Sequence, residues 1–140
     1  MIDLLLIEDN RGDIRLMQEA LEFSEPGLKI HVVEDGEDAI RFLSQEGKYS
    51  DAPRPRLIFL DLNLPRKDGR EVLSHIKQDD SLRRIPVIVL TTSEARQDIA
   101  NAYDLHANCY IRKPSDLDRF LDVMHTCRSF WLSMVTLPAG

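Results

Sequence analysis

The sequence predicts an α/β fold in which a doubly wound parallel sheet of five strands carries helices on both faces. Apolar runs alternate with amphipathic segments along the chain, which is the pattern of repeated strand and helix units. Three runs, at 4–7, 57–60 and 87–90, are apolar at every position. Strands of this kind are typical of parallel sheets that are buried on both faces. Right-handed crossovers then restrict the possible strand orders to a few.

The first half of the chain is expected to contain three strands and two helices. The expected strands are 2–7, 30–33 and 57–60, and the expected helices are 13–21 and 37–45. The helices are placed where apolar residues recur at helical spacing, as Ala39, Ile40 and Leu43 do. Breakers at 25–27 close the first helix, and two prolines in 47–56 favour a surface loop before the third strand.

The second half adds two strands and three helices. The expected strands are 87–90 and 108–111, and the expected helices are 70–78, 94–105 and a last one that starts at 115–116. Val72, Leu73 and Ile76 give the first of these helices an apolar face. Ser115 and Asp116 are favourable residues for the start of the last helix. Because no linker or repeat divides the chain, residues 1–140 are expected to form one domain, with 129–140 as a C-terminal extension.

Composition fits a single domain that works in the cytoplasm. The 140 residues are 43% hydrophobic, which is enough for one core, and the net charge is −6. A negative chain without a clustered basic face is not expected to bind nucleic acid. No signal-peptide pattern and no run of membrane-spanning length occurs, so no membrane partner is expected. Cys109 and Cys127 lack metal or redox spacing and are expected to be buried, reduced thiols.

Side chains that can carry chemistry follow the three apolar runs. Glu8 and Asp9 follow the first run, Asp61 follows the second and Thr91 follows the third. Parallel strands bring their C-terminal ends together at one edge of the sheet, where open α/β folds bind ligands. We therefore expect three carboxylates and a hydroxyl in one cleft. Like charges gathered in this way require compensation by a cation or by phosphate chemistry.

These residues belong to a longer pattern that resembles a known family. The members of the pattern are Glu8-Asp9, the stretch DLNLPRKDG at 61–69, Thr91, Tyr110 and Lys113-Pro114. In order and spacing they resemble the receiver domain of two-component response regulators, over nearly the whole chain. The resemblance implies the flavodoxin-like strand order 2-1-3-4-5. The stretches DLNLP and DGREVL within 61–73, LHANCY at 105–110 and SFWL and VTLP within 129–138 further resemble the stand-alone regulators of cyanobacterial phytochromes.

The resemblance implies that Asp61 is the phosphoacceptor and that Mg²⁺ is the cofactor. A carboxylate is a poor nucleophile toward a phosphoryl group unless the charge on both is neutralised, and Mg²⁺ is the usual means. By resemblance, Asp9 and Asp61 ligate the ion directly and Glu8 holds a coordinated water. The backbone carbonyl of Asn63 adds a further ligand. From its position alone, Glu8 could instead be a charge at the sheet edge with no metal role.

Lys113, Thr91 and Tyr110 complete the implied site. The Lys113 ammonium would pair with a phosphoryl oxygen or with Asp61, and the Thr91 hydroxyl would donate to the phosphoryl group. Tyr110 has the family's switch-aromatic position, where its ring would enter space that Thr91 vacates. From local sequence alone, Lys113 could be a surface lysine and Tyr110 a core tyrosine. Thr92 is the other candidate for the hydroxyl.

The peptide bond between Lys113 and Pro114 is the last feature that the resemblance concerns. It implies a cis bond, which would aim Lys113 into the cleft. A cis bond would also give refolding a phase of tens of seconds.

Three other functions compete with a phosphorylation switch. A haloacid-dehalogenase-like phosphatase also forms an aspartyl phosphate, but it needs an acid where this chain has Asn63. A flavodoxin-like electron carrier needs a Gly/Ser/Thr-rich phosphate loop, and this chain has EDNR at 8–11. A degenerate receiver that acts as a phosphorylation-independent binding module would lose Asp61 or Lys113, yet it remains the alternative. The sequence favours a response regulator that takes its phosphoryl group from a histidine kinase. It would be a phosphoacceptor with weak, Mg²⁺-dependent self-phosphorylation and self-dephosphorylation, not a turnover enzyme.

The output surface is predicted at the C-terminal end of the chain. Apolar residues continue beyond those that the last helix needs, and they are Phe130, Trp131, Leu132, Met134, Val135 and Leu137. They would either fold back over the domain or form an exposed patch for a partner. The resemblance favours a homodimer through the fourth helix, the fifth strand, the last helix and the tail. Because no output domain follows, we expect signalling through protein contacts, with a histidine kinase, namely a cyanobacterial phytochrome, upstream.

Overall fold

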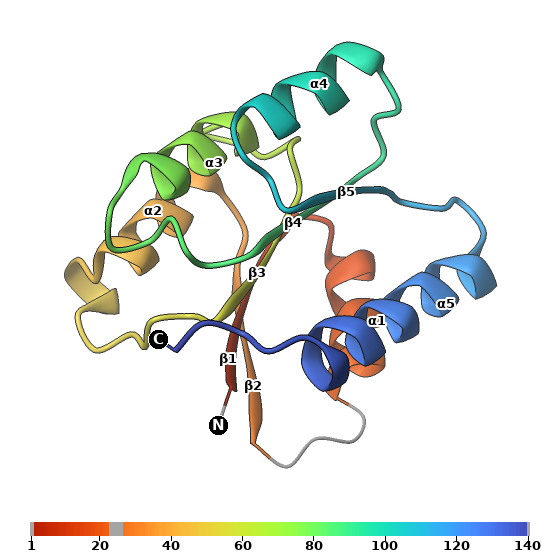
Figure 1. Cartoon of the computed structure of the whole chain (residues 1–140), viewed down its shortest axis with the longest axis horizontal. Coiled ribbons are helices and arrows are strands. Elements are labelled where there is room, and N and C mark those ends of the chain that lie inside the picture. The colour runs from red at the N-terminus through yellow and green to blue at the C-terminus, as the bar shows by residue number, and fades with distance from the viewer. Residues whose placement is uncertain (1, 23–26, 140) are drawn as a thin grey trace.

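The sheet has five parallel strands in the order β2-β1-β3-β4-β5, which confirms the predicted fold. The computed structural model describes residues 2–22 and 27–139. The strands are β1 (Ile2–Ile7), β2 (Leu28–Val33), β3 (Leu57–Leu60), β4 (Val87–Thr91) and β5 (Cys109–Arg112). β3 lies at the centre of the sheet, and every neighbouring pair is parallel (Figure 1).

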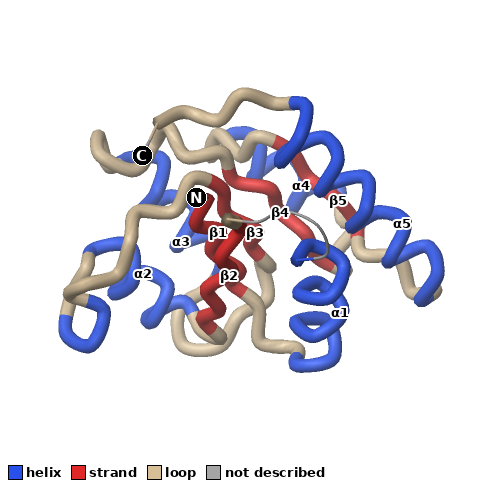
Figure 2. The backbone as a smooth tube through the Cα atoms, turned by 90° about the horizontal axis from the view of Figure 1, so that it is seen from below, coloured by secondary structure: helices blue, strands red, loops and turns tan. Residues whose placement is uncertain are grey.

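Two layers of helices enclose the sheet. The α-helices are α1 (Arg11–Glu22), α2 (Gly36–Ser44), α3 (Gly69–Gln78), α4 (Arg96–Asp104) and α5 (Leu117–Cys127). α1 and α5 cover one face, and α2, α3 and α4 cover the other (Figures 1 and 2). A short 3-10 helix, Gly47–Tyr49, lies within the predicted surface loop.

The predicted boundaries differ from the observed ones at a few element ends. α4 begins at Arg96 and not at residue 94, because Ala95 has an extended backbone, and its N–H donates to the Ser93 hydroxyl oxygen at 3.3 Å. Asp116 is the N-cap of α5 as predicted, but its side chain makes no capping hydrogen bond. Of the breakers expected after α1, Glu25 and Pro26 lie outside the described residues.

The core consists of two apolar layers, one on each face of the sheet. Successive side chains of a strand point to opposite faces. Leu5 and Ile7 therefore pack toward α2 and α3, while Leu4 and Leu6 pack toward α1 and α5. Because both layers are filled, the central strands contain the fully apolar runs 4–7, 57–60 and 87–90, which are the pattern that predicted a parallel sheet.

The C-terminal segment folds back over the domain and leaves part of its apolar surface exposed. After α5, residues Arg128–Met134 form a π-helix, and Leu137 joins the core with 7% of its surface exposed. The Arg56 guanidinium donates to the carbonyls of Leu137 and Pro138, each at 3.1 Å. Phe130 and Met134 remain 45% and 74% exposed. Both outcomes considered for these residues thus occur, in different parts of the segment.

Lys77 links α3 to the N-terminal ends of β4 and β5 by hydrogen bonds. Lys77, in the last turn of α3, donates from Nζ to the carbonyls of Arg83 and Ile85 at 3.0 and 2.8 Å. It also donates to the Asn108 Oδ1 atom at 3.0 Å, and that oxygen accepts a bond from the Val87 backbone N–H at 2.8 Å. Burial lowers the pKa of Lys77. Its hydrogen-bond partners are neutral oxygens, so no negative charge offsets this effect.

Both cysteines are free, as predicted. Cys127 is buried and Cys109 half-buried, and burial raises the pKa of each thiol to about 11. Among the described residues, no helix has the length and apolarity that a membrane crossing requires.

Candidate functional site

Backbone hydrogen bonds bring the ends of the strands to one edge of the sheet. The Asp61 N–H donates to the Ile7 carbonyl at 3.0 Å, and the Lys113 N–H donates to the Thr91 carbonyl at 2.7 Å. The side chains that follow the strands therefore meet in one place, as the apolar runs predicted. Glu8, Asp61, Thr91 and Lys113 are buried there, with at most 7% of any of them exposed.

Three carboxylates at this edge are placed to share a cation. One oxygen from each of Glu8, Asp9 and Asp61 lies within 4.8 Å of the other two. Glu8 Oε2 accepts backbone hydrogen bonds from Asp9 and Asn10, both at 3.1 Å. Burial, together with the negative charge of Asp61, raises the pKa of Glu8 to about 7, although its bond to Lys113 opposes the shift. An all-oxygen set of this charge fits a hard divalent cation.

Lys113 places its ammonium among carboxylates. Nζ lies 2.5 Å from Glu8 Oε1, 3.1 Å from Asp61 Oδ2 and 2.9 Å from Asp13 Oδ2. Burial by itself would lower the pKa of Lys113, but the bonds to Glu8 and Asp13 outweigh it and the pKa is raised. Lys113 is therefore a buried cation and not a surface lysine.

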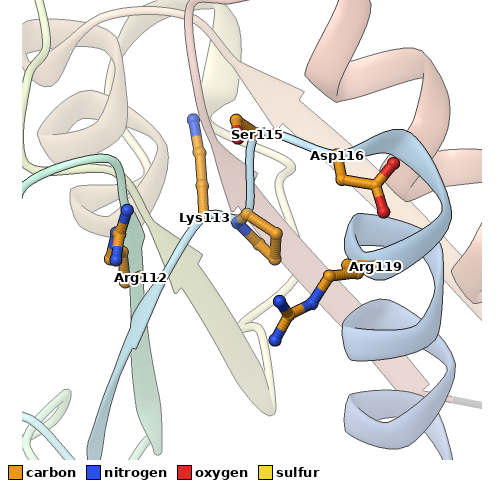
Figure 3. Close-up of a pocket in the computed structure, with 6 residues that line it drawn as sticks. Arg112, Lys113, Ser115, Asp116 and Arg119 are labelled. Atoms are coloured by element: carbon orange, nitrogen blue, oxygen red, sulfur yellow. The ribbon is translucent and has the colours of Figure 1, made fainter.

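Lys113 also lines a pocket whose lining includes none of Glu8, Asp9 and Asp61. It has a volume of about 220 Å³ and includes Arg112, Asp116 and Arg119 in its lining. The Lys113 side chain extends away from those of Asp116 and Arg119, which lie at the start of α5 (Figure 3).

The predicted cis bond between Lys113 and Pro114 is wrong. No peptide bond in the described residues is cis, so this bond is trans. The trans form is the ordinary lower-energy form of an X–Pro bond, and with it the Lys113 side chain already reaches the carboxylates, so no cis bond is needed to aim it. The slow refolding phase expected from a cis bond loses its basis.

Sequence reasoning missed Asp13. This residue lies in the first turn of α1, one helical turn beyond the acidic pair Glu8-Asp9. Its spacing was the available signal, because a side chain in the first turn of a helix that follows a strand faces the same sheet edge. Its contact with Lys113 spans a hundred residues of sequence, which no local pattern reveals.

Two glycines hold the loop that follows Asp61 close to the strand ends. A Cβ atom at Gly69 would lie 2.3 Å from the Asp61 carbonyl oxygen, and one at Gly36 would lie 1.9 Å from the Lys67 carbonyl oxygen. Any larger residue would therefore push the loop outward. Within the loop, the Asn63 N–H donates to Asp61 Oδ1 at 3.1 Å, which orients the Asp61 carboxylate.

Thr91 is the last residue of β4, and Tyr110 lies in the neighbouring strand β5, opposite Val89. Thr91 is fully buried whereas Thr92 is exposed, and Asn63 Nδ2 approaches Thr91 Oγ1 at 3.5 Å. Tyr110 is half-buried, and its hydroxyl donates to the Ser93 carbonyl at 2.8 Å. Burial raises the pKa of Tyr110. Its hydroxyl is thus bonded to the loop that follows Thr91.

A polar network that sequence reasoning missed continues from this loop. Asp98 accepts from the Ser93 hydroxyl at 2.5 Å and pairs with Arg70 at 2.7 Å. Arg70 also pairs with Asp68, the N-cap of α3, at 3.0 Å. The hydrogen bond from Ser93, together with Arg70, holds the pKa of Asp98 below its ordinary value. The network connects the loop after Asp61 with α4 and, through Ser93, with Tyr110.

Comparisons with known proteins agree with this architecture. The sequence pattern of the response regulator receiver domain matches residues 4–125. The response regulator Rcp1 of Synechocystis sp. is 50% identical over 137 residues, which are 98% of this chain and 93% of that protein. Its Mn²⁺-bound crystal structure superposes with a TM-score of 0.97 at 49% identity and covers 99% of this chain and 100% of that one.

A second solved structure is equally similar. It is that of RcpA, a cyanobacterial phytochrome response regulator, in its phosphorylated form. Its TM-score is 0.96 at 51% identity, with 99% of each chain covered. The strand order, the carboxylate cluster and these matches show that the chain belongs to the response regulator receiver domain family.

Proposed function

We propose that this protein is a phosphorylation switch that accepts a phosphoryl group on Asp61 from a histidine kinase. The observation that carries the proposal is the buried contact between Asp61 and the Lys113 ammonium, beside two further carboxylates that can share a cation. Such a cluster is costly to bury without a ligand, so its presence favours a functional role. The phosphorylated structure of RcpA, 51% identical, supports it.

The residues around Asp61 have separate roles in the transfer. A carboxylate oxygen of Asp61 attacks the phosphorus of a phosphohistidine, the P–N bond breaks, and the histidine nitrogen takes the electron pair. Lys113 neutralises charge on the phosphoryl oxygens, and Thr91 donates its hydroxyl to one of them. Acetyl phosphate would serve as a small donor, with acetate as the leaving group.

Mg²⁺ is the ion that we propose for the carboxylates. Asp9 and Asp61 would ligate it directly, Glu8 would hold one of its waters, and the Asn63 carbonyl would add a ligand. When bound, the ion neutralises charge on the phosphoryl group and on the attacking carboxylate. The oxygen-only donor set suits Mg²⁺, and the Mn²⁺-bound form of Rcp1 supports a divalent cation.

A labelling experiment tests the assignment of Asp61. Incubation with acetyl phosphate and Mg²⁺ should add one phosphoryl group, measured by intact mass, and Asp61→Asn should take none. Asp80→Asn is the matched control, because the Asp80 side chain is 91% exposed and pairs with Arg83, not with Lys113. Labelling of Asp61→Asn at the wild-type level would contradict the proposal. Partner binding that is the same in wild type and Asp61→Asn would favour the phosphorylation-independent binding module.

We propose that Ser93 couples the phosphoryl group to Tyr110. A shift of Thr91 toward the phosphoryl group would also move the loop that follows Thr91. In this loop the Ser93 carbonyl accepts a hydrogen bond from the Tyr110 hydroxyl. The same residue contacts Asp98, so α4 would respond with it. A local change in charge would thereby alter the surface formed by α4 and β5.

The upstream partner that we propose is a phytochrome histidine kinase in the cytoplasm. The similarity to RcpA, a phytochrome response regulator, supports this pairing. Phosphotransfer from a purified cyanobacterial phytochrome should be faster than transfer from an unrelated histidine kinase at equal concentration. Equal rates would contradict the pairing while leaving Asp61 as the acceptor.

The downstream surface that we propose is a homodimer contact along β5, α5 and the C-terminal segment, bordered by α4. A groove of about 370 Å³ between β5 and α5 is lined by Ile111, Val123 and Cys127, with Arg119 and Asp122 also in its lining. Opposite charges beside an apolar groove permit self-complementary contacts about a twofold axis. The exposed Phe130 extends this surface.

Light scattering tests the dimer. Phe130→Asp and Met134→Asp should shift the protein toward the monomer, because both side chains are exposed and their loss should leave the core intact. Ser50→Asp is the control, since Ser50 is exposed in the loop before β3. A dimer that survives the first two changes would contradict this contact.

A further inference from the structure

Three carboxylates contact the Lys113 ammonium, and the proposed function assigns a role to Glu8 and Asp61 but none to Asp13. An ammonium has three N–H donors, and those of Lys113 meet Glu8, Asp61 and Asp13. In that function, Glu8 serves the cation and Asp61 becomes the phosphorylated group. Both contacts must therefore change during phosphoryl transfer.

The surroundings of Asp13 leave its carboxylate free for Lys113. Asn10 caps the start of α1, because its side chain accepts from the Asp13 backbone N–H at 3.0 Å. Within the described part of the chain, Lys113 is the side chain that the Asp13 carboxylate contacts, at 2.9 Å. About a quarter of the Asp13 side chain is exposed, so it approaches Lys113 from the solvent side of the cleft.

We propose that Asp13 is a positioning residue that keeps the Lys113 ammonium directed at the phosphoryl group while Glu8 and Asp61 exchange partners. This inference rests on the proposed function and deepens it. Asp13 lies on α1, an element separate from the strand that leads to Asp61 and from the loop that follows it. A charge-assisted bond from a fixed helix turn holds the ammonium in one orientation, which is the condition for efficient transfer.

A different role for Asp13 is that of an acid that stabilises the N-terminus of α1. Acidic residues in a first turn interact favourably with the helix dipole. That role needs no contact with Lys113 and predicts that Asp13→Asn affects only stability. Asn10 already supplies the cap, and the ammonium lies at hydrogen-bond distance, so the geometry favours the positioning role.

Two readouts on the full chain separate these roles. The first is the rate of phosphorylation by acetyl phosphate at saturating Mg²⁺, which should fall roughly tenfold in Asp13→Asn, the factor that one lost charge-assisted bond commonly gives. Asp13→Glu retains the charge and should recover part of the rate. Glu19→Gln, which removes an exposed acid from the same helix, should leave the rate unchanged.

The second readout needs neither metal nor phosphoryl donor. The ammonium of Lys113 should give a slowly exchanging ¹H–¹⁵N signal in the metal-free protein, and Asp13→Asn should weaken or shift it while Glu19→Gln does not. Unchanged rate and unchanged signal in a folded Asp13→Asn protein would overturn the inference and leave the proposed function standing. A wild-type protein that takes no phosphoryl group would overturn both.

Discussion

Lys113 lies at the C-terminal ends of the strands and Lys77 lies near the N-terminal ends of β4 and β5. The partners of the two lysines differ in charge. Lys77 donates to two backbone carbonyls and an amide oxygen, and burial lowers its pKa. Lys113 donates to three carboxylates, which raise its pKa against the effect of burial. Neutral partners make a clamp that joins α3 to the starts of β4 and β5. Because the partners of Lys113 are anionic, its ammonium stays charged and can bind an anionic ligand at the edge where parallel sheets bind ligands.

The largest expected effect is that of removing the Lys113 ammonium from the carboxylate cluster. Lys113→Met should reduce phosphorylation of Asp61 by about 10²-fold or more, because a preorganised charge on the phosphoryl oxygens is lost. It should also lower the free energy of unfolding of the metal-free protein by about 3–5 kcal/mol, since the carboxylates are left unpaired. Denaturant unfolding and acetyl phosphate labelling measure the two effects. Wild-type labelling by a folded Lys113→Met protein would break the contrast with Lys77.

Titration of Glu8 gives the next largest effect. The unfolded chain loses this proton near pH 4.5, whereas the folded protein keeps it up to about pH 7. Within this window the folded state binds more protons, so the free energy of unfolding falls as pH rises, by about 3 kcal/mol for this group. Metal-free wild type should thus lose stability between pH 4.5 and 8 relative to Glu8→Gln. Parallel pH profiles of the two proteins would argue against a raised pKa.

Removal of the neutral clamp should change stability without changing the chemistry. Lys77→Met leaves two carbonyls and the Asn108 oxygen without their donor, which should cost about 1–3 kcal/mol. The rate of Asp61 phosphorylation should stay within a factor of about two, because the partners of Lys77 are Arg83, Ile85 and Asn108, which are not among the residues of the acidic edge. A large loss of labelling in folded Lys77→Met would show that the edges are coupled.

The smallest effect concerns the network between α3 and α4. Arg70→Met removes the pair with Asp98, and because Arg70 is partly exposed we expect a stability loss of about 1 kcal/mol or less. Labelling of Asp61 should continue at the wild-type rate, but the phosphorylation-induced shift of the Tyr110 NMR signals should shrink. Arg83→Met, which removes the exposed pair with Asp80, is the control. An unchanged Tyr110 response would exclude Arg70 from the coupling.

The sequence was most informative where a residue's place depended on its strand. Apolar runs predicted the sheet, and the residues after them, Glu8, Asp61 and Thr91, meet as expected because the end of a buried parallel strand fixes their position. Lys113 follows the same rule. The roles assigned to these residues stay predictions.

Contacts between distant elements were beyond local patterns. Asp13 and Asp98 lie on helices, and whether a polar helical residue faces solvent or a neighbour depends on packing that periodicity does not specify. The clamp at Lys77 depends in the same way on Asn108, thirty-one residues later. The cis bond was predicted from family resemblance, and the hydrogen bonds from Lys113 Nζ to Glu8 and Asp61 show that the side chain reaches the carboxylates without it.

Mapping the phosphorylated residue in three proteins tests the central contrast most directly. Wild type, Lys77→Met and Lys113→Met would be treated with acetyl phosphate and Mg²⁺, and the labelled aspartate identified by peptide mass spectrometry. We predict label on Asp61 in wild type and in Lys77→Met, and none above background in Lys113→Met. Label at another residue, or equal label on Asp61 in all three proteins, would contradict the assignment of Lys113 and Asp61 to a phosphoryl-transfer site.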